Sequence, residues 1–216
     1  MILSNGCIYI GSFLNDRFHG DNEQLLMPSM VIYQGKFTQG KTSPIGMLLY
    51  PDGDIYYGQH NQFVKEGIGK LIQFSGGFLE GTWEQDKLSG PNCRVYDEET
   101  GDLYVGPMEE GKRSGKGRLY DAARDEVYEG DFENNSKQGE GKVYRRNGEV
   151  LRGDFRHNAM EGTFHLLDTL SKADVERVFN NARKPSELYI TVNKKAQSKV
   201  DTILSMAAPR EPGLVG

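Results

Sequence analysis

Several features common in secreted, membrane-spanning or nucleic-acid-binding proteins are missing from this chain of 216 residues. Its only cysteines are Cys7 and Cys93, which provide no disulfide framework and suit a reducing compartment. No apolar run approaches the roughly 18 residues of a membrane span, and no apolar signal-peptide core follows Met1. The net charge is −5, so the basic excess that nucleic acid or anionic lipid attracts is lacking as well. We therefore expect a soluble intracellular protein that does not bind nucleic acid.

Glycine and aromatic residues are abundant instead. The chain has 27 glycines, well above ordinary usage, together with 11 tyrosines, 10 phenylalanines and one tryptophan. The glycines follow no Gly-X-Y period, which excludes collagen, and the aromatic content argues against disorder. Together, glycines and aromatics predict short strands joined by tight turns.

One glycine recurs at intervals of 23 to 25 residues and defines seven units. The repeat glycines are Gly11, Gly35, Gly58, Gly81, Gly106, Gly130 and Gly153. Two residues before them stand Tyr9, Tyr33, Tyr56, Leu79, Tyr104, Tyr128 and Leu151. Two residues after them stand Phe13, Phe37, His60, Trp83, Met108, Phe132 and Phe155. Because side chains alternate along a strand, these positions share one face, where the glycine leaves room for a neighbouring ring or lets the chain bend closely.

The second half of each unit predicts a turn and a returning strand. Five residues after the repeat glycine, where the turn needs positive φ, stand Asp16, Gly40, Phe63, Asp86, Gly111, Asn135 and Asn158. Nine and eleven residues after it comes a Gly-x-Gly pair, complete at Gly67/Gly69, Gly115/Gly117 and Gly139/Gly141. Each unit is therefore expected to be one hairpin, which cannot bury its aromatic face alone but can do so when stacked on its neighbours.

The motif Tyr-x-Gly-x-Phe/Trp-x-x-Gly-x-x-x-Gly-x-Gly, at a period near 23 residues, resembles the MORN repeat (membrane occupation and recognition nexus). Residues 104–117 and 128–141 are nearly complete copies, and the resemblance covers about residues 4–166. It implies an all-β fold, in which tandem hairpins form an elongated single-layer antiparallel sheet, twisted into a trough with its aromatics on the concave side. We accordingly expect a MORN-repeat array at residues 1–166 and a C-terminal helical tail at residues 167–216.

Departures from the motif mark three weak points in the array. The first lacks the second glycine of its pair, and we expect its return segment, residues 21–30, to be irregular. The third has His60 at the aromatic position and Phe63 at the turn position. The seventh fades after Gly162, as a terminal cap would.

Helix signals begin after residue 167. Ser171 and Asp174 make a capping box, and the helix after it has an apolar side formed by Val175, Val178, Phe179 and Ala182. A second helical pattern has an apolar side formed by Val192, Ala196, Val200, Ile203, Leu204 and Ala207, although residues 188–192 also fit a short strand. The first helix either caps the repeat array of its own chain or docks on another protein.

No motif for catalysis is convincing. Residues 35–42 match the phosphate-loop pattern G-x-x-x-x-G-K-T, but that loop must lead from a parallel strand into a helix. Here both glycines are repeat positions and Pro44 follows at once. The four histidines show no metal-ligand spacing, and no nucleophile elbow or kinase signature is present. We expect a protein that is not an enzyme and has no cofactor or metal site.

The aromatic face is the remaining candidate for function. Its rings are Tyr9, Phe13, Tyr33, Phe37, Tyr56, Trp83, Tyr104, Tyr128, Phe132 and Phe155. These rings form the thin core of a single-layer sheet, and an exposed aromatic groove is also an interaction surface with good anchor residues. The hypothesis is that a partner helix or extended segment lies in the trough.

The resemblance implies a structural scaffold within a cytoskeletal assembly, as in ciliary or flagellar axonemes (radial-spoke heads and their neighbours) and parasite cortical cytoskeletons. We expect the partners to be other proteins of a large assembly, with the axoneme as first location and a homodimer as a further arrangement. Two alternatives stay open, a membrane tether that binds phosphoinositides and a regulatory subunit of an enzyme. Charge disfavours lipid, because residues 1–166 carry 18 Lys/Arg against 25 Asp/Glu, a net −7, while the tail is +2.

Overall fold

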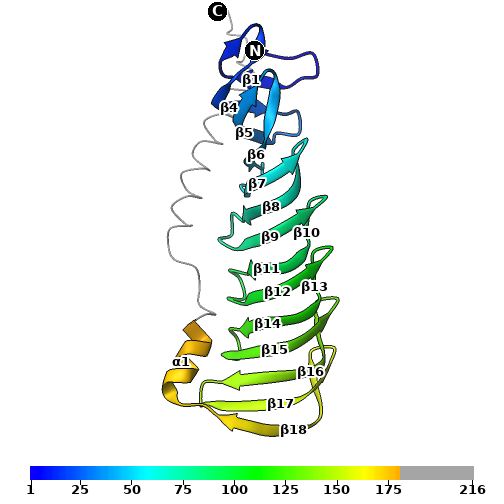
Figure 1. The fold of residues 1–216 in the computed structure, drawn as a ribbon, viewed down its shortest axis with the longest axis vertical. Helices are drawn as coiled ribbons and strands as arrows, with labels where there is room; N and C mark the ends of the chain where they lie inside the picture. Colours follow the sequence, from blue (N-terminus) through cyan, green and yellow to red (C-terminus); the bar gives the residue numbers. More distant parts are fainter. Residues whose placement is uncertain (181–216) are drawn as a thin grey trace, which may run out of the picture.

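The computed structural model describes residues 1–180, which form one long antiparallel sheet and a single helix (Figure 1). The first strands are β1 (Ile8–Ile10), β2 (Phe13–Leu14), β3 (Arg17–Phe18), β4 (Gly20–Leu26), β5 (Ile32–Thr38), β6 (Lys41–Leu49), β7 (Ile55–Asn61), β8 (Val64–Ile72) and β9 (Phe78–Glu84). The remaining strands are β10 (Lys87–Leu88), β11 (Gly90–Tyr96), β12 (Leu103–Glu109), β13 (Lys112–Arg113), β14 (Gly115–Asp121), β15 (Glu126–Glu133), β16 (Ser136–Arg145), β17 (Glu149–Arg156) and β18 (Ala159–Thr169). The helix is α1 (Lys172–Asn180).

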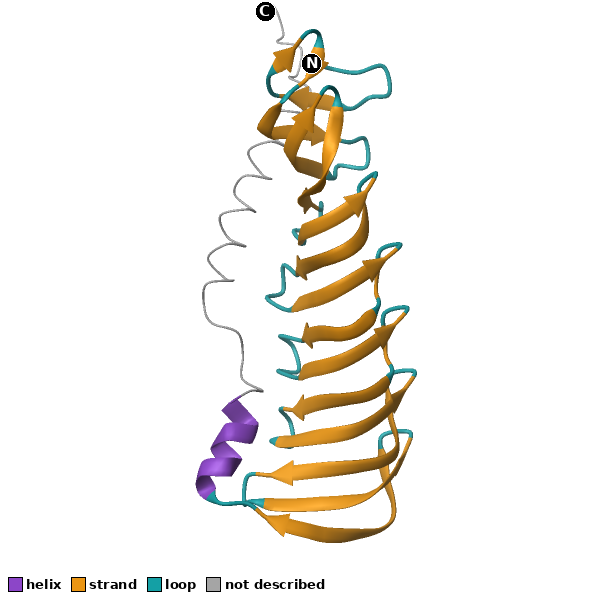
Figure 2. Ribbon diagram, viewed as in Figure 1, coloured by secondary structure: helices purple, strands orange, loops and turns teal. Residues whose placement is uncertain are grey.

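The strands pair in chain order, which confirms the predicted all-β array of tandem hairpins. Sixteen strands belong to one sheet, whose path runs from β1 through β4 to β18, with β10 and β13 attached at its side. Strands β2 and β3 form a separate hairpin. The path does not close on itself, so the sheet is elongated and single-layered (Figure 2). Strand β18 extends to Thr169, beyond residue 166 where we placed the end of the array.

Register shifts near the repeat glycines separate each hairpin tip from the main sheet. The pairing of β7 with β8 shifts between Gly58 and His60, and that of β15 with β16 shifts between Gly130 and Asp131. In the fourth unit, residues 78–80 of β9 pair with β11 while residues 83–84 pair with β10. Such bulges bend a strand and increase its twist. The tips therefore project from one side of the sheet as a second column, which includes β10 and β13 (Figure 1).

The predicted turn residues adopt the left-handed conformation. The seven residues five positions after the repeat glycines have φ between 57° at Asp16 and 84° at Gly40. Asn135 and Asn158 have φ of 73° and 70°, and asparagine tolerates this left-handed region better than most residues. Phe63 has a φ of 69° and is the bulky exception, so the third unit carries backbone strain at its tip.

The return segment of the first unit is more regular than we expected, and the prediction of an irregular segment at residues 21–30 is wrong for residues 23–26, while the pairing is irregular between Gly20 and Glu23. They belong to β4, which pairs with β1 and β5 and places Leu25 opposite Tyr9. Glu23 explains the difference, because its side chain fills the space beside Gly20 and accepts the backbone N–H of Ser12 at 3.0 Å. A carboxylate thus occupies the space that a ring fills in other units.

The two faces of the sheet carry different groups. The face that holds the repeat tyrosines, called the aromatic face below, carries the largest buried cluster. The opposite face, called the outer face, carries α1, which packs beside the C-terminal strands (Figure 1). Within residues 1–180, no helix has the length and apolar content needed to cross a bilayer.

Candidate functional site

Four repeat tyrosines lie over pairs of glycines on the aromatic face. A Cβ added to Gly141 would lie 2.4 Å from the ring of Tyr128, and one added to Gly130 would lie 2.3 Å from its hydroxyl oxygen. The other pairs are Gly35 and Gly46 beneath Tyr33, Gly58 and Gly69 beneath Tyr56, and Gly106 and Gly117 beneath Tyr104. The room for a ring that we predicted at the repeat glycine is confirmed, and it also explains the second glycine of the Gly-x-Gly pair.

Each repeat tyrosine also donates its hydroxyl hydrogen to a backbone carbonyl three residues ahead. The O···O distances are 2.8 Å from Tyr9 to Ser12, 3.3 Å from Tyr33 to Lys36, 2.6 Å from Tyr56 to Gln59, 2.7 Å from Tyr104 to Pro107 and 2.9 Å from Tyr128 to Asp131. Burial raises the pKa of Tyr104 to about 12 and raises the pKa of Tyr56 and Tyr128 further. These hydroxyls therefore stay protonated and act as structural donors.

The two units with leucine in place of tyrosine fill the same space differently. Beside Gly81 in the fourth unit lies the thiol of Cys93, 2.8 Å from where a Cβ would stand. Beside Gly153 in the seventh unit lies the ring of Phe164, at 2.6 Å. Cys93 is fully buried and its thiol pKa is raised by that burial, so both replacements are packing residues.

The aromatic residues two positions after the repeat glycines connect neighbouring units. Phe132 meets the rings of both Tyr104 and Tyr128 edge-on, with centroids 5.2 Å apart in each case. In the third unit, His60 stands edge-on to Tyr33 at 5.1 Å and stacks on Phe63 at 5.7 Å. Burial lowers the pKa of His60, which favours the neutral ring. The two departures in the third unit therefore compensate each other.

The turn residues make a second set of hydrogen bonds that sequence reasoning missed. Asn135 donates its backbone N–H to the carbonyl of Arg113 in the preceding unit, at 3.1 Å, and its Oδ1 accepts the N–H of Arg113 at 2.8 Å. We call this pairing the tip contact. Its backbone bond recurs from Gly40 to Phe18, from Asp86 to Lys65, from Gly111 to Leu88 and from Asn158 to Lys137. Asx residues are favoured at the turn for this reason as well as for their φ, since Asp86 and Asn158 repeat the side-chain bond.

The residues that receive the tip contacts cover the aromatic rings. Phe18 stacks on Tyr9 with centroids 4.0 Å apart, and the Lys137 ammonium lies 5.1 Å from the centre of the Tyr128 ring. Arg113 lies over Tyr104 at 5.8 Å in the same way. Burial lowers the pKa of Lys137, even though Asp121 lies 4.0 Å away. The hairpin tips thus fold over the aromatic face.

Because of this cover, most of the predicted trough residues are buried. Nine of the ten aromatic side chains expose 4% or less of their surface, at Tyr9, Tyr33, Phe37, Tyr56, Trp83, Tyr104, Tyr128, Phe132 and Phe155. Phe13, in the separate first hairpin, is 49% exposed. In this structure the nine rings form the core, which was one of the two roles that the sequence allowed. Contact between these rings and a partner stays a prediction.

Helix α1 begins where the capping box predicted and packs on the outer face. The Ser171 hydroxyl accepts the N–H of Asp174 at 3.3 Å and donates to its carboxylate at 2.7 Å. Val175 and Phe179 are buried against Val127, with Val178 partly buried beside them. Ala182, together with the second helical pattern and the alternative strand at residues 188–192, lies outside the described residues. The apolar side of α1 therefore docks on its own sheet, on the face opposite to the aromatic core.

The outer face carries a continuous apolar row, called the outer stripe. Its members are successive cross-strand register partners, namely Ile8, Leu26, Ile32, Leu49, Ile55, Ile72, Phe78, Tyr96, Leu103, Tyr120, Val127, Tyr144 and Val150. This row was not predicted, although the sequence contains a signal for it. The residue before the repeat Tyr or Leu is apolar in all seven units, from Ile8 to Val150.

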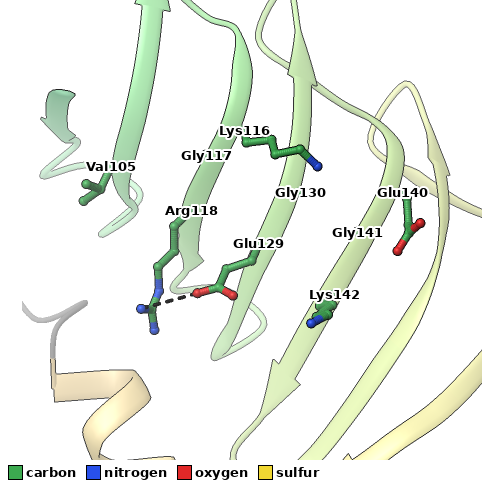
Figure 3. Close-up of a pocket in the computed structure, with 9 residues that line it drawn as sticks. All are labelled: Val105, Lys116, Gly117, Arg118, Glu129, Gly130, Glu140, Gly141 and Lys142. Carbon is green, nitrogen blue, oxygen red and sulfur yellow. Dashed lines mark ion pairs between the residues drawn. The ribbon is translucent and has the colours of Figure 1, made fainter. Parts of the chain in front are cut away.

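A hollow of about 450 Å³ lies on the outer face over β14, β15 and β16 (Figure 3). Three glycines that face Tyr104 and Tyr128 on the other side leave it open, and charged side chains surround it. Arg118 pairs with Glu129 at 3.5 Å, and Arg118 also donates to the carbonyl of Val178 at 2.7 Å. Arg118 therefore connects α1 to the sheet through its hydrogen bond to Val178, while its ion pair with Glu129 joins β14 to β15.

The segment resembling a phosphate loop has a different geometry. Residues 35–42 form the tip of the β5–β6 hairpin, in which Thr38 pairs with Lys41 and Phe37 pairs with Thr42. A strand follows Lys41, so the helix N-terminus that a phosphate loop requires is not at this position. Within residues 1–180, no three His, Cys, Asp or Glu side chains gather as metal ligands.

Comparison with known proteins agrees with the repeat pattern. Residues 9–20, 33–55, 104–124 and 128–150 match the MORN repeat family. These segments begin at the first, second, fifth and sixth units, whereas His60, Leu79 and Leu151 replace motif residues in the other three.

Two further similarities are more limited. Alsin of Rattus norvegicus is 28% identical over 91 residues, which is 39% of this chain but 5% of alsin, so the chain spans a small part of that relative. Among solved structures, the TCP domain of SAS-4 (dCPAP) of Drosophila melanogaster, in complex with a proline-rich motif of Ana2 (dSTIL), is similar over 76% of this chain and 86% of that one. Its identity is 11% and its TM-score 0.35, so it carries no weight for fold or function. The repeat motif, the tyrosines over paired glycines and the family match agree, and the chain is a MORN-repeat protein.

Proposed function

We propose that this protein is a non-enzymatic scaffold that binds other proteins within a cytoskeletal assembly, with the ciliary axoneme as the first location to test. The main support for the proposal is that neighbouring units of the array are joined in two ways. Neighbouring units are joined by the main-sheet ladder and, at five of the steps, by a tip contact such as that between Asn135 and Arg113. Surfaces at different points of such an array keep fixed separations, which is what a scaffold requires.

The middle of the outer face supports a protein-binding role. Ile45 on β6, Tyr57 on β7 and Ile68 on β8 are 48%, 63% and 72% exposed. The register places them on one face as diagonal neighbours, because Tyr57 stands opposite Met47 and Lys70. We call these three residues the central patch. Adjacent exposed apolar side chains mark interaction sites, and a tyrosine among them is a frequent anchor.

A membrane tether is the second candidate, and the charge of the array disfavours it. Residues 1–166 have a net charge of −7, which anionic lipid repels. Co-sedimentation with phosphoinositide vesicles that falls steeply with salt would favour the tether over the scaffold. Copurification with a catalytic chain would favour the remaining alternative, a regulatory subunit.

Crosslinking mass spectrometry of ciliary axonemes containing the tagged full chain tests the scaffold proposal. We expect crosslinks to axonemal proteins near the central patch, and about a tenfold or greater loss of axonemal association in Tyr57→Glu/Ile68→Glu. The matched control is Phe74→Glu/Met160→Glu, which adds the same charge at exposed apolar positions away from the patch and should keep the association. A full chain that stays monomeric and captures no cytoskeletal component contradicts the proposal.

A further inference from the structure

The outer stripe is much longer than the element that covers it. Within residues 1–180, α1 is the only helix, and it packs around Val127 at the C-terminal end of the stripe. Toward the first units the stripe continues through two buried clusters. One cluster consists of Phe78, Tyr96 and Leu103, and the other consists of Leu26, Ile32, Leu49 and Ile55. A sheet face that is apolar along its whole length needs a second layer to bury it.

Helix α1 runs along the outer stripe toward the first units. The helix follows Leu170, whose N–H donates to the carbonyl of Gly148 in the β16–β17 turn at 2.8 Å. At its other end, the Val178 carbonyl accepts a hydrogen bond from Arg118 on β14. The rings of Phe179 and Tyr120 meet edge-on there, with their centroids 6.2 Å apart. The C-terminal end of α1 therefore points along the outer stripe, toward these two clusters.

The sequence of residues 192–207, which lie outside the described residues, matches this surface in shape. Its apolar positions fall on one side of a helix, at Val192, Ala196, Val200, Ile203, Leu204 and Ala207. Sixteen helical residues are about 24 Å long, which equals about five strand spacings. A helix of this length would reach part of each cluster if it were centred over the strands between Ile55 and Phe78.

The charges match as well. The segment carries Lys194, Lys195 and Lys199 against Asp201. The turns beside these two clusters, residues 50–54 and 97–102, present exposed carboxylates at Asp52, Asp97 and Glu99. Helix α1 sets the precedent, because Arg146 of the adjacent turn lies 3.8 Å from Glu176 and 3.9 Å from the centre of the Phe179 ring.

We propose that residues 192–207 form a helix that docks on the outer stripe of their own chain, around Ile55 and Phe78, and continues the layer that α1 begins. This inference deepens the scaffold proposal but concerns the purified chain, which needs no partner for the test. Failure of one proposal is therefore distinguishable from failure of the other.

Carbodiimide crosslinking of the purified full chain tests the docking, since this reagent joins lysine amines to carboxylates that lie in contact. An equal mixture of isotope-labelled and unlabelled chain separates links within one chain from links between copies. We expect links within one chain, from Lys194, Lys195 or Lys199 to Asp52, Asp97 or Glu99. Links between copies would assign the surface to a second molecule, and absence of any link between these two groups would also overturn the proposal.

Two matched double variants make the test specific. Val200→Glu/Ile203→Glu places two charges on the apolar side of the segment, and we expect the links to fall at least about tenfold because charge is costly to bury there. Ser198→Glu/Ser205→Glu adds the same charge on the opposite side and should leave the yield of links within about twofold. Equal yields from the two variants would contradict docking through the apolar side. The substituted positions lie outside the repeat array, so loss of the fold does not complicate the result.

Discussion

The sixth and third units build the same hairpin with different side chains. In the sixth unit, Tyr128 lies over two glycines, Phe132 meets the rings of two units, and Asn135 makes the tip contact. In the third unit the tyrosine over its glycines is kept, but His60 and Phe63 take the other two positions.

The difference separates what a unit requires from what it can replace. Phe63 does not repeat the tip contact, and its N–H is directed at His60 Nδ1 at 3.4 Å instead. Phe63 contributes a ring to the stack with His60 and Tyr33 in exchange for a strained φ. The ring over paired glycines is common to both units, so we expect it to contribute most to stability. Four changes, in order of decreasing effect, test this comparison.

The largest loss is expected when the space beneath the tyrosine is filled. In Gly141→Ala the new Cβ would lie 2.4 Å from the Tyr128 ring, so the ring has to move, and we expect the free energy of unfolding to fall by about 2–3 kcal/mol. Urea denaturation measures the loss. In Tyr128→Leu/Gly141→Ala the ring is gone, so the double change should cost less than the sum of the single changes. Additive costs would show that the ring and the glycine are not coupled.

Loss of a tip contact should have the next largest effect. Asn135→Ala removes the 2.8 Å bond to Arg113 and places alanine at a φ of 73°, so we expect a loss of about 1–2 kcal/mol. Asn135→Gly removes the same side-chain bond but accommodates the φ, and its loss should be smaller. If the glycine variant is as stable as the wild type, the side-chain bond contributes nothing and only the φ matters.

Removal of one repeat hydroxyl should have a more modest effect. Tyr128→Phe keeps the ring over its glycines but loses the 2.9 Å hydrogen bond to Asp131, and we expect a loss of about 1 kcal/mol. The matched control is Tyr57→Phe on the outer face, where the side chain is 63% exposed and stability should not change. Equal effects at the two positions would argue against a structural role for the buried hydroxyl.

The smallest effect is a pH dependence that belongs to the third unit. Burial lowers the pKa of His60 below its usual 6.5, so the unfolded chain binds the proton more readily than the folded chain. The stabilisation is present above pH 6.5 and is lost as the pH falls toward the folded pKa. His60→Phe copies the sixth unit and removes this dependence. Thermal denaturation between about pH 7 and pH 5 should therefore favour the variant increasingly, and parallel curves would contradict the assignment.

The repeat positions made most of the array predictable. The spacing of Gly130, Tyr128 and Phe132 places them on one strand face, and Asn135 at the turn implies positive φ. Each of these predictions depends on neighbours within one hairpin, and each is confirmed. The exception among local predictions is β4, where Glu23 replaces a ring in a way that the glycine pattern does not reveal.

The closure of the aromatic face could not be predicted in the same way. It depends on bulges at the glycines and on the positions of Lys137 and Arg113 over aromatic rings. A lysine or arginine in a polar hairpin tip gives no sequence signal that its side chain covers a ring. The outer stripe was accessible in principle, because Ile55 and Val127 precede repeat tyrosines. It was missed because each strand begins with two adjacent apolar residues, one on each face of the sheet. Such a pair shows no alternation of polar and apolar residues.

The tip contact also determines how the length of the molecule can change. Its donor and acceptor, such as Asn135 and Arg113, occupy the same two positions in successive units, so an inserted or deleted unit presents matching ends to its neighbours. Each unit adds two strands, or about 10 Å, to the long axis. The length of the array therefore changes in steps of about 10 Å. The number of repeats sets the distance between binding partners at the two ends of the array.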